Sequence, residues 1–180
     1  MIAHVFRPKR KRNGKTEAGR IYRGRIRLDG DFAITEVCLE TSDKQVAERK
    51  LAEIIREMER ERAGLIAPKT QRVAAQKPLS DHLADFVADL TTLGRSEIYR
   101  EQVKARVSRL LGECGWKHVG DVSVDGFVAW RSKQRGFAPK TLNEYLNAAS
   151  VLLNWMERQG RVADNPLKKI PHADTRGKQG

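Results

Sequence analysis

Three arginines at alternate positions are the residues whose spacing most directly suggests a binding chemistry. Arg23, Arg25 and Arg27 lie in the segment 21–28, and glycine and isoleucine occupy the positions between them. Because successive side chains of a β-strand point to opposite faces, a strand here would place the three arginines on one face, about 6.6 Å apart. Guanidinium groups bind phosphates and the acceptor edge of guanine, so this pattern predicts contact with a nucleic acid.

A second regular row of polar residues lies in the segment 139–159, which has the apolar periodicity of a helix. Opposite the apolar stripe, a row at spacings of three and four residues consists of Lys140, Asn143, Asn147, Ser150 and Asn154. Asparagine is unfavourable inside a helix, and its amide can pair with adenine in the major groove of DNA. The row fits a DNA-facing surface or an ordinary solvent-exposed face, and we favour the DNA-facing interpretation.

Two further groups of basic residues are candidates for contacting phosphates. The first lies near the N-terminus and consists of Lys9, Arg10, Lys11, Arg12 and Lys15. The second follows one side of a predicted helix over residues 96–114 and consists of Arg95, Arg106 and Arg109. The alternatives are a disordered basic arm that aids solubility and a basic helix side of the kind found on many soluble proteins.

Residues suited to catalysis or metal binding do not gather in the sequence. The histidines are scattered without the spacing of metal ligands, at His4, His82, His118 and His172. Asp81, Asp85 and Asp89 recur at every fourth position, a pattern that we interpret as the solvated face of a helix. No glycine-rich phosphate loop of the GxxxxGK[ST] type occurs. The sequence therefore predicts no catalytic residue, no bound metal and no cofactor.

Charge and composition narrow the class of partner. The 180 residues carry a net charge of +12, and residues 1–30 hold ten basic residues against two acidic ones. Such asymmetry is typical of proteins that bind nucleic acid or an anionic membrane. No apolar run has the length of a membrane span, and the N-terminus lacks the apolar region of a secretory signal. Cys38 and Cys114 are too isolated for a disulfide framework or a zinc site, so we expect a reducing cytoplasm as the location.

The periodicity predicts an α+β chain with two domains. In residues 1–66, strand patterns over 3–7, 21–28 and 32–40 predict a small three-stranded antiparallel sheet, with Asn13 and Gly14 in a loop. A helix is expected to begin at Ser42, end at Gly64 and cover one face of the sheet, which leaves the arginines exposed.

The rest of the chain is predicted to be helical. Residues 67–77 lack a clear period and are interpreted as a basic linker, and residues 173–180 as a tail. Between them, residues 78–172 predict an all-α domain of four helices, which span residues 79–93, 96–114, 124–133 and 139–159.

Two stretches of the sequence resemble one known family. The first is RIYRGRIR at residues 20–27 together with TSDKQVAER at residues 41–49. The second is PKTLN at residues 139–143, followed by Leu152, Trp155, GRV at residues 160–162 and NPL at residues 165–167. In this order they resemble the N-terminal half of the tyrosine recombinases of the phage-integrase family. The resemblance covers nearly the whole chain.

The resemblance implies two DNA-binding domains and a further domain beyond them. Residues 1–66 would be an arm-type DNA-binding domain, and residues 78–172 a core-binding, SAM-like domain. Arm-type and core-type duplex sites would be the partners, together with other recombinase protomers. The catalytic domain, with its tyrosine nucleophile, would follow residue 180, because Tyr22, Tyr99 and Tyr145 do not match the nucleophile position.

Two alternatives to the recombinase interpretation stay open at this point. One is a stand-alone DNA-binding regulator or recombination decoy that has no catalytic half. The other is an RNA-binding protein.

Overall fold

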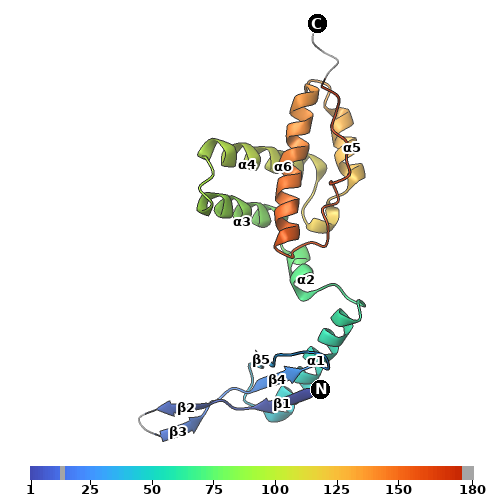
Figure 1. Ribbon diagram of the computed structural model, residues 1–180. Coiled ribbons are helices and arrows are strands. Elements are labelled where there is room, and N and C mark those ends of the chain that lie inside the picture. The colour runs from blue at the N-terminus through green and yellow to red at the C-terminus, as the bar shows by residue number, and fades with distance from the viewer. Residues whose placement is uncertain (13–14, 176–180) are drawn as a thin grey trace. The chain divides into compact units, whose positions relative to one another are not determined.

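The computed structural model describes residues 1–12 and 15–175 and divides into two compact units, Met1–Ala67 and Pro68–Gly180 (Figure 1). The first unit contains the strands and one helix, and the second is helical, so the α+β class predicted from the sequence is confirmed. No helix in the described part of the chain is long and apolar enough to cross a membrane.

The first unit is built on a three-stranded antiparallel sheet in the order β1-β4-β5. Its strands span Ile2–Phe6 (β1), Arg23–Arg27 (β4) and Thr35–Cys38 (β5). Helix α1, Lys44–Arg62, packs on one face of this sheet. Ile26 of β4 and Leu51 of α1 are buried between the two layers, whereas Arg25 and Arg27 are exposed. The expectation that α1 covers the apolar face is therefore confirmed.

A glycine permits the close approach of α1 to the sheet. A Cβ atom added at Gly24 would lie 2.5 Å from Cδ1 of Leu51 and 3.2 Å from Cγ2 of Val37. Any larger residue at this central position of β4 would therefore require the buried Leu51 side chain to shift. The glycine among the arginines thus fixes which face of β4 turns towards α1.

The basic N-terminal segment is more ordered than the sequence predicted. Strands β2, Lys9–Arg12, and β3, Lys15–Ala18, pair antiparallel as a separate two-stranded ribbon. We expected a loop here. Residues 13 and 14, which we placed in that loop, lie outside the described residues. An Asn-Gly pair is a strong hairpin signal, but the runs KRKR and KTEA beside it are poor in strand-forming residues, which is why the sequence favoured a loop.

The start of α1 is also corrected by the structure. Asp43, and not Ser42, is the N-cap, and its side chain accepts a hydrogen bond from the backbone amide of Val46 at 3.0 Å. The helix ends as expected beside Gly64, which has a positive φ of 70°. The aspartate also places a negative charge near the helix N-terminus, where the macrodipole favours it.

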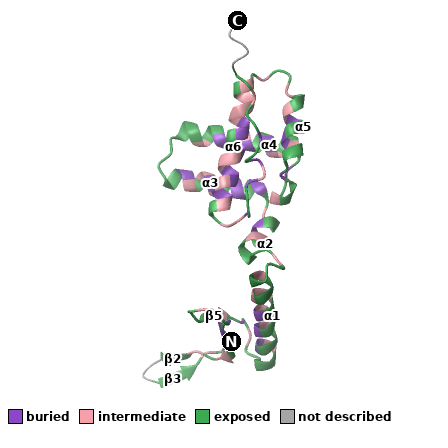
Figure 2. Ribbon diagram, turned by 45° about the vertical axis from the view of Figure 1, so that its right-hand side comes forward, coloured by how far each residue is buried: buried purple, intermediate pink, exposed green. Residues whose placement is uncertain are grey.

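The second unit contains the four helices that were predicted. They span Leu79–Thr92 (α3), Glu97–Cys114 (α4), Val124–Lys133 (α5) and Pro139–Arg158 (α6), with a short 3₁₀ helix η1 at Val119–Asp121. One apolar core joins them, and its largest fully buried side chains include Phe86, Phe127 and Met156. Figure 2 shows buried positions of these helices in purple.

The segment interpreted as a linker contains a fifth α-helix of this unit. Helix α2, Lys69–Gln76, is attached to the start of α3 through Ala74, which is buried. The carbonyl oxygen of Ala74 lies 2.9 Å from Nε2 of His82, and Nζ of Lys77 donates to Asp85 at 2.6 Å. Eight residues give too short a window for a periodic signal, and these anchoring contacts are tertiary.

A polar cluster replaces the solvated aspartate face that we expected on α3. His82 is 1% exposed, and its Nδ1 lies 2.9 Å from the guanidinium of Arg161. The same guanidinium donates to Asp85 at 2.7 Å, and Nε1 of Trp155 donates to Asp89 at 2.8 Å. Two of the three aspartates therefore connect α3 to α6 and to the segment that follows it.

Candidate nucleic-acid interface

The uncovered face of the three-stranded sheet holds the arginines of β4, and we call it the basic sheet face. The strand register sets Arg27, Arg25 and Arg23 opposite Ile2, His4 and Phe6 of β1. On the other side, Arg25 and Arg23 lie opposite Glu36 and Cys38 of β5. Directly paired residues of an antiparallel sheet share a face, so one surface holds three guanidinium groups, one carboxylate and two rings.

Arg25 is held in place by two neighbours. Its Nε donates to Oε1 of Glu36 at 2.8 Å. Its guanidinium carbon lies 4.5 Å from the centre of the Phe6 ring, the geometry of a cation–π contact. Arg23 is bound more loosely, because its Nη1 lies 3.7 Å from Oε2 of the same glutamate.

Arg27 differs from the other two arginines of the face. Its side chain is exposed, and within residues 1–12 and 15–175 it forms no hydrogen bond or ion pair. The basic sheet face thus combines one unpaired arginine with two that share a single carboxylate.

The ribbon of β2 and β3, which we call the basic hairpin, carries the N-terminal cluster. Lys9, Lys11 and Lys15 are exposed. Arg10 and Arg12 lie in β2, where their backbones pair with Glu17 and Lys15, and their side chains are outside the described part of the structure. Lys9 and Lys11 are two residues apart on one strand and therefore share a face of the ribbon.

The basic residues predicted along α4 are largely bound within the second unit. Arg106 forms an ion pair with Glu144 at 2.6 Å. Arg109 pairs with Glu113 at 2.6 Å, and its guanidinium carbon lies 4.8 Å from the centre of the Phe137 ring. Arg95, at the start of the helix, is exposed.

The Arg109–Glu113 pair belongs to a larger polar and aromatic cluster. Nε1 of Trp130 donates to Glu113 at 2.6 Å, and this bond, followed by the bond from Arg109, lowers the pKa of the Glu113 carboxyl. The bond to Glu113, followed by a contact with the hydroxyl of Tyr145, raises the pKa of Arg109. Arg109 therefore orders the ends of α4, α5 and α6, a role that the sequence analysis did not foresee.

The asparagines of α6 are likewise occupied by their own chain. Asn143 donates through Nδ2 to the carbonyl oxygen of Ala173 at 2.9 Å and accepts through Oδ1 from the amide of Ala173 at 2.7 Å. Asn147 Oδ1 lies 2.9 Å from Nε2 of His172, and Asn154 Oδ1 accepts from Asn165 at 2.7 Å. We call these three residues the asparagine row.

The partner of the asparagine row is the stretch 165–175, the C-terminal segment, which runs beside α6 in both views (Figures 1 and 2). Leu167 and Ile170 of this segment are buried, and Arg131 donates to the carbonyl of Pro171 at 3.0 Å. The amides of the asparagine row are therefore partnered within the chain, although Asn147 itself is exposed, and contact of the row with DNA stays a prediction. Lys140, at the start of α6, is exposed.

No protein-family model matches the sequence, and no curated protein matches it significantly. Among solved structures, the integrase from mycobacterium phage Brujita is similar, with a TM-score of 0.48 and 22% sequence identity. The match covers 56% of this chain and 33% of the integrase chain, so the matched part spans about a third of that protein's length.

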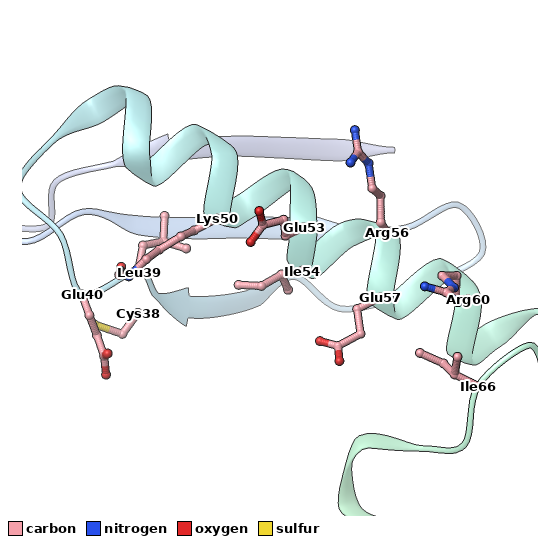
Figure 3. Close-up of a pocket in the computed structure, with 10 residues that line it drawn as sticks. All are labelled: Cys38, Leu39, Glu40, Lys50, Glu53, Ile54, Arg56, Glu57, Arg60 and Ile66. Atoms are coloured by element: carbon pink, nitrogen blue, oxygen red, sulfur yellow. Dashed lines mark hydrogen bonds between the residues drawn. The ribbon is translucent and has the colours of Figure 1, made fainter. Parts of the chain in front are cut away.

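The first unit also has a hollow of about 500 Å³ between α1 and the chain around the end of β5 (Figure 3). Leu39, Ile54 and Ile66 give it apolar surface, and both acidic and basic residues of α1 surround them. Lys50 is already used, because its Nζ donates to the carbonyl of Leu39 at 2.9 Å. The described residues include no group of three His, Cys, Asp or Glu placed to hold a metal.

Sequence reasoning missed two members of the basic sheet face, Phe6 and Glu36. Both follow from alternation, the same signal that identified the arginines. His4 and Phe6 alternate with Ala3 and Val5, and Glu36 alternates with Thr35 and Val37. What the sequence did not supply was the register that brings these residues beside Arg23 and Arg25.

Proposed function

We propose that this chain is a duplex DNA-binding portion of a site-specific tyrosine recombinase, an integrase that acts in the integration and recombination of a mobile element. The observation that carries the DNA-binding part is the basic sheet face. Helix α1 covers one side of the sheet, and the opposite side presents Arg23, Arg25 and Arg27, of which the last two are exposed.

The shape of this unit suits the major groove. The groove is about 12 Å wide and admits a two-stranded β-ribbon, and neighbouring strands lie about 4.8 Å apart. A sheet face can therefore enter with its arginines directed at base edges. The basic hairpin supplies the phosphate contacts in this proposal, because exposed lysines bind the backbone of DNA without regard to sequence.

The recombinase part rests on the sequence motifs at residues 20–27, 41–49 and 139–167. On this proposal, residues 1–66 bind arm-type sites and residues 78–172 bind core-type sites. In the second unit, the exposed predicted contacts include Arg109 and Asn147, which already have partners within the chain. Arg95 and Lys140 are exposed as well, and we assign these two to phosphates. Strand cleavage is not assigned to any residue of this chain.

The proposal is tested by comparing the affinity of the full chain for different nucleic acids. Binding is measured by fluorescence anisotropy with a labelled 30-base-pair duplex, the corresponding single strand and an RNA hairpin of equal charge, at several salt concentrations. We expect the duplex to bind most tightly, with log K falling linearly as log salt rises. Tighter binding of the RNA hairpin, or no binding of any duplex, would overturn the proposal.

A further inference from the structure

The basic sheet face contains a carboxylate that phosphate binding does not explain. Glu36 lies on the edge strand β5, opposite Arg25, and pairs with two of the three arginines of the face. A negative charge there weakens the attraction of the face for DNA of any sequence. Exposed ion pairs add little to folding stability, so stability does not account for it either.

The contacts of Glu36 leave one edge of Arg25 available. A guanidinium has five N–H donors, and Glu36 accepts from the Nε donor of Arg25. Within the described part of the chain, Arg25 forms no other hydrogen bond, so its Nη1 and Nη2 donors are unoccupied. Two parallel donors on one planar group match the O6 and N7 acceptors of guanine.

The ring of Phe6 restrains the same side chain on its flat face. Its centre lies 4.5 Å from the guanidinium carbon of Arg25. The carboxylate and the ring together limit rotation of the guanidinium. A group held in one orientation loses less conformational entropy on binding and discriminates better between acceptor patterns.

We infer that Arg25 reads a guanine in the major groove, and that Glu36 and Phe6 are positioning residues that hold its guanidinium for this contact. The inference rests on the proposed function and deepens it, because it separates sequence reading from phosphate binding within one face. Arg27 lies on the same strand and face without a hydrogen-bond or ion-pair partner in the described chain, and it serves as the phosphate-binding counterpart.

The test is selection of bound sequences from a duplex pool with a randomised central segment, using the full chain. The wild type is expected to enrich guanine at one position, and Arg25→Ala to lower that preference about 5- to 150-fold. Arg25→Lys keeps the charge but not the two parallel donors, so it should lose the preference with little change in salt dependence. The matched control Arg27→Ala should weaken binding to all sequences and keep the preference.

The positioning role has its own readout. Glu36→Gln removes the negative charge, so overall affinity should rise, but the guanine preference should fall because Arg25 is released. A uniform rise in affinity with an unchanged preference would show that Glu36 acts only through its charge, and would overturn the positioning role.

The outcomes separate this inference from the proposed function. Duplex binding without any base preference, or a preference that survives both Arg25 variants, would overturn the inference and leave DNA binding intact. Absence of duplex binding by the wild type would overturn both. Arg25 and Glu36 are exposed, and circular dichroism of each variant verifies that the fold is kept.

Discussion

Residue spacing predicted that two faces of this molecule contact DNA, and the two faces differ in how far other parts of the chain occupy their side chains. The basic sheet face of the first unit is left uncovered by α1. The asparagine row of the second unit is hydrogen-bonded to the C-terminal segment, although Asn147 of the row is still exposed.

The difference follows from what each side chain can bind. An asparagine amide has a donor and an acceptor, the pair that adenine requires, but a peptide group offers the same pair. Asn143 uses both on the backbone of Ala173. Arginine has donors only and needs an acceptor such as a carboxylate. The spacing of asparagines is therefore an ambiguous sign of base recognition. Arginines are a clearer sign only where no acidic residue lies close enough to pair with them.

The largest expected effect separates the two faces in a DNA-binding assay. Replacing Arg23, Arg25 and Arg27 together with alanine should lower affinity for duplex DNA about 10- to 100-fold. It should also flatten the plot of log K against log salt by about 0.9 for each phosphate that the variant no longer binds. The same substitution of the asparagine row should change affinity by less than about threefold, because its amides already have partners.

The control for this comparison removes equal charge from another surface of the same unit. Arg49, Arg56 and Arg60 are exposed on α1, away from the basic sheet face. Their triple alanine variant should bind almost as the wild type does. Equal losses of affinity in the two triple variants would mean that net charge alone, and not the sheet face, attracts DNA.

The next effect concerns the stability of the second unit and is centred on His82. Burial lowers the pKa of His82, and its two nitrogens bind Ala74 and Arg161. His82→Ala should lower the free energy of unfolding of the second unit by about 2–3 kcal/mol. All three tryptophans lie in this unit, so tryptophan fluorescence during urea unfolding reports on it alone.

The same histidine predicts a pH dependence. Folded His82 stays neutral below its ordinary pKa of 6.5, where the unfolded chain takes up a proton. The unfolded state then binds more protons, so stability falls as the pH drops from about 7.5 to about 5.5. Asp85, whose pKa is lowered below 3.8 mainly by Lys77, changes charge at lower pH. His82→Gln should flatten the dependence, and parallel curves for the two proteins would contradict it.

The smallest effect is local and tests whether the asparagine row holds the C-terminal segment. Asn143→Ala removes two hydrogen bonds to Ala173. Hydrogen exchange of the Ala173 backbone amide should therefore become about 5- to 10-fold faster, equivalent to about 1 kcal/mol. Duplex affinity should stay the same. A change in base preference with unaltered exchange would restore the DNA-facing interpretation of the row.

Local patterns predicted much of this fold. The helix predicted over 124–133 has the observed bounds of α5, and alternation in β4 assigned Ile26 to the core and Arg25 to the surface. Such assignments depend only on residues that are close in the sequence, and the apolar periodicity gives them directly.

Most of the wrong assignments involve partners that are distant in the sequence. Nothing near Asn143 indicates that residue 173 will bind it, and nothing near Asp85 indicates Arg161. Arg106 was assigned to phosphate because Glu144, which binds it, lies 38 residues away. Arg109 pairs with Glu113 at the i,i+4 spacing, which the sequence could have shown. A sequence therefore predicts the face on which a polar side chain lies better than it predicts the partner that this side chain binds.

The free thiol of Cys38 offers a way to follow the basic sheet face in the unaltered protein. Cys38 is exposed, lies opposite Arg23 in the strand register and also lines the hollow beside α1 (Figure 3). Burial raises the pKa of the other thiol, Cys114, to about 11, so a thiol-reactive label at about pH 8 should modify Cys38 first. Duplex DNA seated on the face should slow that labelling. The native protein thus carries its own footprinting probe, placed by the same register that aligns the arginines.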